Sequence, residues 1–295
     1  MQRIRILMTV FILLAIPCLV LAGGAGTTGG ITLSQTIGAR AEAMAEAYTA
    51  VSGDVLGIYY NPALASTLKE KQAAILYQKG IAEDNFGAFS VGAPLGFGTV
   101  AGSLVYYNAG DVELIDLAGK ERTVNAQKDL LAIFSYAKKI GKFSAGASLK
   151  YLSSKLAEEK ATTPAFDLGG NYQINTRTMV GLAILNIGGE LRYLKEADEI
   201  PLTIRAGISH QWPELLIAGD IVKRDDKTSG HIGAEYTFKK LLSIRAGYTI
   251  DEDLGGPGFG FGLNHNQFSI NYALSSKEDL DLSHYVGLTY KLGSP

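Results

Sequence analysis

The chain has 295 residues, of which 47% are hydrophobic and 19% charged, and its formal net charge is −2. A charge so close to zero gives no indication of a nucleic-acid-binding surface. The single cysteine, Cys18, excludes a disulfide within the chain.

The N-terminus has the pattern of a secretory signal peptide. Arg3 and Arg5 precede an apolar run over residues 6–21. Small residues end the run and predict cleavage after Ala22, which gives a signal peptide over residues 1–22. An uncleaved anchor helix is the alternative, but the run is short for a membrane span and contains Pro17. The one cysteine lies inside the leader, so the exported chain has no thiol for disulfides or catalysis.

Residues 23–71 lack strand alternation and are predicted to fold as a plug, or hatch. Residues 38–51 are rich in helix formers, which fits a short helix or a compact loop. Pro62 restricts Asn61 to extended conformations, so a tight local structure is expected there. We expect Asn61 to hydrogen-bond the inner wall and Pro62 to fix the path of the chain. A local turn with no gating role is the alternative.

An ordered motif in this region resembles the N-terminal signature of the PorV/PorQ family, which is similar to the FadL-type outer-membrane transporters. The motif consists of Gly38-Ala39-Arg40, Ala47-Tyr48-Thr49-Ala50, Asp54 and Tyr60-Asn61-Pro62-Ala63. The resemblance implies a fourteen-stranded barrel with an N-terminal hatch in its lumen. It also implies that Asp54, Asn61, Pro62 and Ala63 are hatch residues.

Period-2 alternation of apolar and polar residues recurs from residue 72 to the C-terminus. Residues 242–251 show it most clearly, with Leu, Ile, Ala, Tyr and Ile on one side and Ser, Arg, Gly, Thr and Asp on the other. Successive side chains of a strand point to opposite faces, so each such segment predicts a strand with one polar face. About fourteen strands are expected, near residues 72–80, 85–93, 97–108, 128–138, 142–153, 164–174, 178–188, 201–210, 214–223, 228–238, 241–251, 257–264, 266–275 and 283–292.

The even strand count behind an export signal favours an all-β fold, a transmembrane antiparallel barrel over residues 72–295. The high counts of 35 glycines and 15 tyrosines suit bent strands and aromatic girdles. The predicted location is the outer membrane of a diderm bacterium after Sec-type export, with outer-membrane lipid as a partner. A soluble β-sandwich also fits alternation with turns and remains the structural alternative.

Two hairpins are predicted to place opposite charges on the inner face. A turn at 212–213 would set Arg205 opposite Asp220, and a turn centred on residue 240 would set Glu235 opposite Arg245. Structural ion pairs in the lumen are favoured over a substrate site. A charge-reversed pair, Arg245→Glu with Glu235→Arg, is expected to restore stability.

Two further strands carry candidate functional residues. Pro94, Gly98 and Gly102 are expected to weaken strand pairing and to form a lateral opening. The last strand resembles the C-terminal signal that the barrel-assembly machinery reads, and the residues that carry this resemblance are Tyr285, Gly287, Tyr290 and Leu292.

The connections are predicted to be short. The longest are expected near 109–127, 154–163, 189–200 and 276–282, and two of these, 154–163 and 189–200, are charged and solvent-facing. FadL-type transporters carry longer outer loops that capture lipid, so this departure weakens the case for ligand capture.

Enzymatic motifs are weak, and neither an enzyme nor a cofactor is expected. The four histidines, at 210, 231, 265 and 284, lack the spacing of metal ligands. The glycine-rich run 255–262 has no βαβ pattern around it and contains Pro257, so we interpret it as a turn entering a strand.

Three functions remain open. The leading one is passive transport of hydrophobic small molecules across the outer membrane. The second is a PorV-like partner of type IX secretion-system proteins, and the third is a closed structural barrel. An apolar lumen pocket would favour transport, whereas a lumen filled by the hatch, with exposed aromatic residues at the rim, would favour the partner role.

Overall fold

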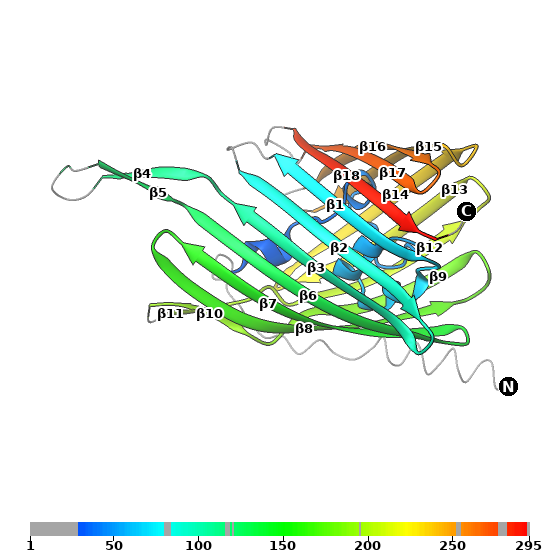
Figure 1. Cartoon of the computed structure of the whole chain (residues 1–295), viewed down its shortest axis with the longest axis horizontal. Helices are drawn as coiled ribbons and strands as arrows, with labels where there is room; N and C mark the ends of the chain where they lie inside the picture. The colour runs from blue at the N-terminus through cyan, green and yellow to red at the C-terminus, as the bar shows by residue number, and fades with distance from the viewer. Residues whose placement is uncertain are drawn as a thin grey trace.

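The computed structural model describes residues 29–79, 84–115, 119, 121–194, 196–251, 255–276 and 282–293. The predicted signal peptide and its cleavage site lie outside these described residues, as do residues 23–28 of the predicted hatch. Fourteen antiparallel strands close into one barrel, in which β1 pairs with both β2 and β18 (Figure 1). The predicted fold class is confirmed.

Each predicted strand overlaps one strand of the barrel. The barrel strands are β1 Lys71–Lys79, β2 Asn85–Leu95, β3 Gly98–Asn108, β6 Gln127–Ile140, β7 Phe143–Leu156, β8 Glu159–Gln173, β9 Thr178–Ile187, β12 Thr203–Gln211, β13 Leu215–Arg224, β14 Lys227–Phe238, β15 Leu242–Ile250, β16 Gly256–His265, β17 Phe268–Ser275 and β18 Ser283–Leu292.

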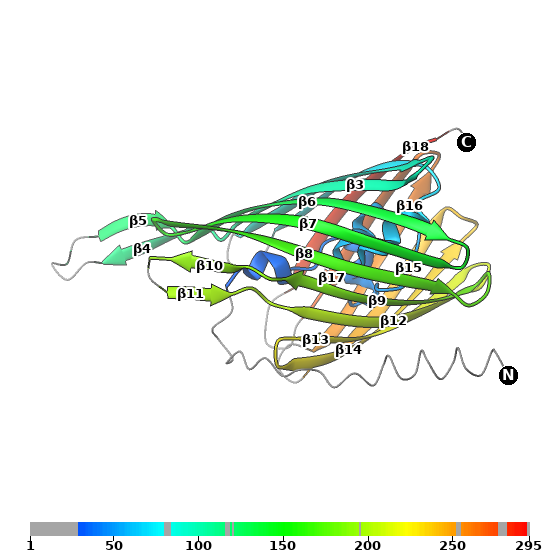
Figure 2. The same cartoon turned by 90° about the horizontal axis from the view of Figure 1, so that it is seen from below.

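Two small hairpins extend the barrel at one end and were expected only as loops. They are β4 Asp111–Ile115 with β5 Glu121–Asn125, and β10 Glu190–Tyr193 with β11 Glu196–Glu199. Figures 1 and 2 show β4 and β5 projecting beyond the other strands. The predicted connection 154–163 is wrong, because β7 and β8 continue through it to a turn at 157–158. Its charged side chains do not interrupt the backbone ladder between the two strands.

The connections differ in length between the two ends of the barrel. At the end where β18 finishes, the turns that join β2 to β3, β6 to β7 and β16 to β17 have two residues each between the strands. The longer connections, which include both extra hairpins, lie at the other end. Bacterial outer-membrane barrels have short periplasmic turns and longer extracellular loops, so this asymmetry orients the barrel.

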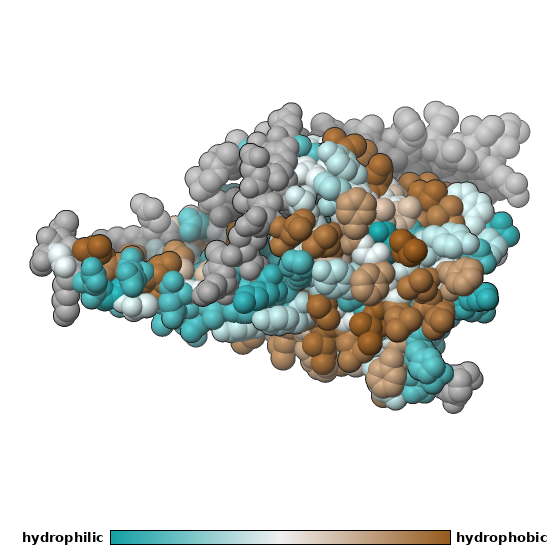
Figure 3. Space-filling model, turned by 90° about the horizontal axis from the view of Figure 1, so that it is seen from above, coloured by the Kyte–Doolittle hydropathy of each residue, from teal (hydrophilic) through white to brown (hydrophobic). Residues whose placement is uncertain are grey.

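The outer surface of the barrel is apolar and the inner surface is largely polar. Outward side chains such as Ile75, Phe134 and Ile232 are more than half exposed, whereas inward ones such as Ser135 and Thr163 are buried. Figure 3 shows apolar side chains gathered over the barrel strands and hydrophilic ones towards both ends. Side chains that alternate in this way suit a barrel with lipid outside and polar groups inside.

The N-terminal segment, defined here as residues 29–70, lies inside the barrel (Figures 1 and 2). It contains the short helices η1 Ile31–Ser34, α2 Ala39–Ala43, η2 Val55–Tyr59 and η3 Pro62–Thr67. Helix α2 packs against β15–β18, η2 against β1 and β2, and η3 against β3 and β6–β8. The predicted 23–71 boundary extends one residue too far, because Lys71 opens β1. In the described part of the chain, no helix is long and apolar enough to cross a membrane.

Candidate functional site in the barrel lumen

Asp220 on β13 is the first anchor of the N-terminal segment. Its Oδ2 atom accepts hydrogen bonds from the backbone N–H groups of Tyr48 and Thr49, at 2.9 and 2.8 Å, and from Thr49 Oγ1 at 2.6 Å. Arg205 on β12 completes the anchor, with Nη2 3.2 Å from Asp220 Oδ2 and 2.6 Å from the Glu46 carbonyl oxygen. Charged hydrogen bonds in a buried site are stronger than neutral ones, so this cluster fixes the chain at residues 46–49.

The predicted pairing of Arg205 with Asp220 is correct as a contact but wrong in register. Asp220 lies opposite Gly207, and Arg205 lies opposite Val222. The turn is centred one residue later than expected, which shifts the pairing by two residues. A two-residue shift keeps each side chain on its face, so the two charges meet diagonally across the strands.

Glu235 on β14 is the second anchor. It lies directly opposite Arg245, as the turn at residue 240 predicts, and Arg245 Nε is 2.5 Å from Glu235 Oε2. The sequence analysis missed a third member, Arg40 of α2, which donates from Nε and Nη2 to both carboxylate oxygens at 2.7 Å. Arg40 also donates to Tyr48 Oη at 3.2 Å. The carboxylate therefore joins a wall arginine to an arginine of the N-terminal segment.

Asn61 is the third anchor and reaches the inner wall as expected. Its Nδ2 donates to Asn171 Oδ1 on β8 at 2.7 Å, to the Gly170 carbonyl at 3.3 Å and to the Thr49 carbonyl at 3.0 Å. Its Oδ1 accepts from the Ala63 N–H at 3.0 Å and so caps η3. Asn61 is fully buried, so each of these bonds is made away from water.

Pro62 fixes the start of η3 against the wall. It occupies the first turn of that helix, where no backbone N–H is required. A Cβ on Gly146 of β7 would lie 2.6 Å from the Pro62 carbonyl carbon and from the Ala63 nitrogen. Only glycine fits at that inward position, because the backbone of the segment comes so close.

Asp54 acts inside the segment. Its Oδ1 accepts from the Leu56 N–H at 2.9 Å and caps η2, while Oδ2 accepts from Tyr48 Oη at 2.6 Å. Asp54 thus links the loop that contacts Asp220 to the helix that precedes Asn61.

A buried cluster on β7, β8 and β9 was not predicted. Lys150 Nζ lies 2.9 Å from Asp167 Oδ2 and donates to Asn186 Oδ1 at 2.7 Å. Asn186 has a φ of 60° at the register shift between β8 and β9, and its N–H donates to Asp167 Oδ1 at 2.8 Å. The cluster therefore stabilises a β-bulge in the wall.

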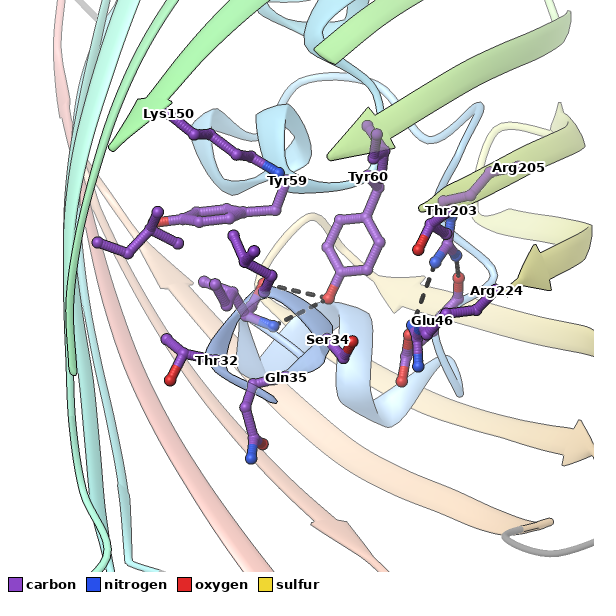
Figure 4. A pocket seen from close by; sticks show the side chains of 14 residues that line it. Thr32, Ser34, Gln35, Glu46, Tyr59, Tyr60, Lys150, Thr203, Arg205 and Arg224 are labelled. Atoms are coloured by element: carbon purple, nitrogen blue, oxygen red, sulfur yellow. Dashed lines mark hydrogen bonds and ion pairs between the residues drawn. The ribbon is translucent and has the colours of Figure 1, made fainter. Parts of the chain in front are cut away.

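The N-terminal segment occupies the lumen, and a pocket of about 20 Å³ lies beside η1 (Figure 4). Polar side chains dominate its lining, among them Glu46, Lys150 and Arg205, and Tyr60 Oη accepts from the Ile37 N–H at 3.1 Å. A volume of this size holds about one water molecule. This pocket is therefore not the apolar lumen pocket that would favour transport.

Burial changes the acidity of the tyrosines in the segment. It raises the pKa of Tyr59 to about 12, and it raises the pKa values of Tyr48 and Tyr60 well above that of free tyrosine. The Tyr59 hydroxyl contacts Ser103 on β3. All three rings are therefore buried in the neutral form at physiological pH.

The structure does not show the expected lateral opening. Pairing between β2 and β3 is continuous through Pro94, Gly98 and Gly102, and Gly102 is also paired with β6. Pro94 lies beyond the last residue of β2 that pairs with β1, so its missing N–H leaves that ladder intact. Gly98 and Leu95 face each other beside the β2–β3 turn.

The last strand, β18, closes the barrel against β1 and β17. Of the predicted assembly residues, Tyr285 and Gly287 face inward, and Leu292 faces outward at the end of the strand. Tyr290 packs on Phe268 with ring centroids 4.8 Å apart. Recognition by the barrel-assembly machinery stays a prediction.

The histidines serve as structural groups where the structure describes their contacts. His231 interacts through Nδ1 with the Ala45 carbonyl at 2.8 Å, and His210 through Nδ1 with Thr178 Oγ1 at 2.8 Å. Within the described ranges no group of three His, Cys, Asp or Glu residues is placed to hold a metal ion.

Neither a family model nor a curated protein matches the sequence. Solved structures do match its fold. The toluene transporter TodX of Pseudomonas putida aligns with a TM-score of 0.67 at 15% identity, covering 88% of this chain and 99% of TodX. The toluene transporter TbuX of Ralstonia pickettii gives 0.66 at 13% identity, over 87% and 98% of the two chains. A FadL homologue of Pseudomonas aeruginosa gives 0.63 at 12% identity, over 88% and 99%. The chain therefore has the barrel fold of FadL-type proteins.

Proposed function

We propose that this chain is an outer-membrane transporter through which hydrophobic small molecules pass without an energy source, and that residues 29–70 act as its hatch. The apolar outer surface supports insertion in a membrane. The solved structures with this fold include two toluene transporters, which supports an apolar substrate of small size.

One observation carries the proposal. Among the described residues, the N-terminal segment makes no backbone–backbone hydrogen bond with any barrel strand. Its hydrogen bonds with the barrel strands run through side chains such as Asp220, Glu235 and Asn61, and its backbone bond at Gly29 goes to Glu199 of the β10–β11 hairpin. The segment can therefore move while every ladder bond of the barrel stays in place, and movement would open more space than the pocket beside η1, which holds about one water molecule.

A filled lumen is also compatible with a PorV-like partner of secretion-system proteins. The aromatic side chains of Phe97, Phe143 and Phe268, exposed beside the short turns, also fit that role, as does the motif around Asn61 and Pro62. The two toluene transporters that share the fold favour transport.

Uptake by cells tests the proposal. The full chain with its leader is produced in a host that lacks its own hydrophobic-compound transporter, and entry of a radiolabelled monoaromatic hydrocarbon is measured against an empty-vector control. Saturable uptake above the control supports transport. A folded, membrane-inserted barrel without uptake contradicts it and favours the partner role or a closed structural barrel.

A further inference from the structure

Three buried oxygen atoms lack a hydrogen-bond partner where α2 meets the wall. They are Oε2 of Glu42, Oε1 of Gln78 on β1 and Oγ of Ser275 on β17. The three residues are only 3%, 6% and 6% exposed. Buried polar groups are nearly always satisfied, so such a set calls for a further partner, either water or an ion.

The three residues surround Tyr285 on β18. Gln78 lies directly opposite Tyr285 in the β1–β18 pair. Ser275 lies opposite Ser283, two residues from Tyr285 on the inward face, so it is a diagonal neighbour. Glu42 is on α2, which packs against β18.

The backbone of Glu42 lies beside the same strands. Its backbone carbonyl occupies the space where a Cβ on Gly258 would lie, and Gly258 is directly opposite Ser275. Helix α2 also packs against β17 and β18. The N-terminal segment and three neighbouring strands thus bring one carboxylate, one amide oxygen and two hydroxyls to the region where α2 packs against β17 and β18.

The charge of Glu42 is not balanced by a cationic side chain. Glu235 and Asp220 each pair with arginine, whereas Glu42 forms no ion pair with any described residue. A buried carboxylate is costly unless a positive charge or several donors accompany it. The buried carboxylate of Asp129 is stabilised by several donors, since Thr32, Ser154 and Gln127 all donate hydrogen bonds to it.

We propose that Glu42, Gln78, Ser275 and Tyr285 bind a monovalent cation, with Na⁺ as the ion to test. The single formal charge of the site balances a monovalent ion. Calcium sites in proteins use more carboxylate ligands, and transition metals favour imidazole and thiolate groups, which this cluster lacks. The ion would join the N-terminal segment to β1, β17 and β18, away from the anchors at Asp220 and Asn61. This inference does not depend on whether the barrel transports a substrate.

The test is the temperature at which the purified full-length barrel unfolds in detergent, read from its heat-dependent gel mobility. NaCl is titrated against N-methyl-D-glucamine chloride at constant ionic strength, which removes general salt effects. Because a ligand that binds only the folded state stabilises it by mass action, the midpoint should rise saturably, by about 3–6 °C at ten times the half-saturating Na⁺ concentration.

Two variants and one control locate the effect. Glu42→Gln should abolish the Na⁺ dependence, and the milder Ser275→Ala should raise the half-saturating Na⁺ concentration at least threefold. Asp129→Asn changes a buried carboxylate that already has three donors, so the dependence should persist. Equal midpoints in the two salts would show that water alone fills the site and would overturn the proposal. A response to CaCl₂ without one to NaCl, or Na⁺ dependence that survives Glu42→Gln, would overturn it as well.

Discussion

Exchange of the charges at Glu235 and Arg245 should fail to restore stability, because Arg40 shares the carboxylate. Considered as a pair, Arg245→Glu with Glu235→Arg merely reverses an ion pair. In the structure, Arg40 Nε lies 2.7 Å from Glu235 Oε2, so an arginine at position 235 would face a second arginine. The double exchange therefore restores the ion pair between positions 235 and 245 but creates a repulsion between position 235 and Arg40.

The magnitude follows from burial. The side chains of Glu235 and Arg245 are 9% and 3% exposed, and removal of one partner from such a buried pair costs about 3–5 kcal/mol. The Arg40 side chain is 20% exposed, so some solvent screens its unpaired charge. We expect Glu235→Arg alone to lose at least about 3–5 kcal/mol, since it also places a third positive charge beside Arg40 and Arg245, and the double exchange to remain about 2–3 kcal/mol below the parent protein.

The assay is urea-induced unfolding of the barrel in lipid vesicles, followed by gel mobility. Addition of Arg40→Gln to the double exchange removes the repulsion and should recover stability to within about 1 kcal/mol of the parent protein. The exposed pair of Arg122 and Glu158 provides the control, since both side chains are more than half exposed and their exchange should change stability by less than about 1 kcal/mol. Full recovery by the double exchange with Arg40 intact would refute the shared-carboxylate interpretation.

Three further predictions concern the contacts between the barrel strands and the N-terminal segment. Asn61→Ala should lower the free energy of unfolding by about 2–4 kcal/mol, because several buried groups lose their hydrogen-bond partner. It should also raise the flux of a hydrophobic probe. Unchanged flux would argue against a gating role. Gly146→Ala should displace η3 and lower the unfolding midpoint. Gly102→Ala is the control and should leave the midpoint unchanged, because its added Cβ meets its nearest atom at 3.5 Å. Equal midpoints for the two variants would contradict the close approach of η3 to Gly146. The neutral Tyr59 ring should stabilise the fold fully below pH 10, and that contribution, on the order of 3 kcal/mol, should be lost as pH rises from 10 to 12. A pH titration of stability should show a smaller loss for Tyr59→Phe, and identical profiles would contradict the burial of this hydroxyl.

The barrel was predictable because each strand carries its own signal. Inward and outward residues alternate along every strand, and turn residues separate the strands, so the fourteen strands follow from local sequence. The register of β14 with β15 also followed from a single turn centre, and it places Glu235 opposite Arg245. The β12–β13 register was wrong because a one-residue error in the turn centre becomes a two-residue shift in pairing.

The contacts of the lumen were not predictable in the same way. Arg40 and Glu235 are 195 residues apart in the chain, and no local pattern records that they meet. One signal was available, namely glycine at inward positions such as Gly146, Gly169 and Gly181, where the segment leaves no room for a side chain. The lateral opening near Pro94 was wrong because proline and glycine at the end of a hairpin leave the neighbouring ladders intact.

Flux through a barrel with a locked segment tests the central claim most directly. The Cβ of Ala39 lies 3.7 Å from the position of a Cβ on Gly287 of β18, which is within the range of a disulfide. Ala39→Cys with Gly287→Cys should block passage of a hydrophobic probe into vesicles when oxidised and restore it when reduced. Ser135→Cys with Ser148→Cys, which joins two neighbouring wall strands, is the matched control and should not affect flux. Equal flux through the oxidised and reduced forms of the first variant would contradict a displaceable hatch.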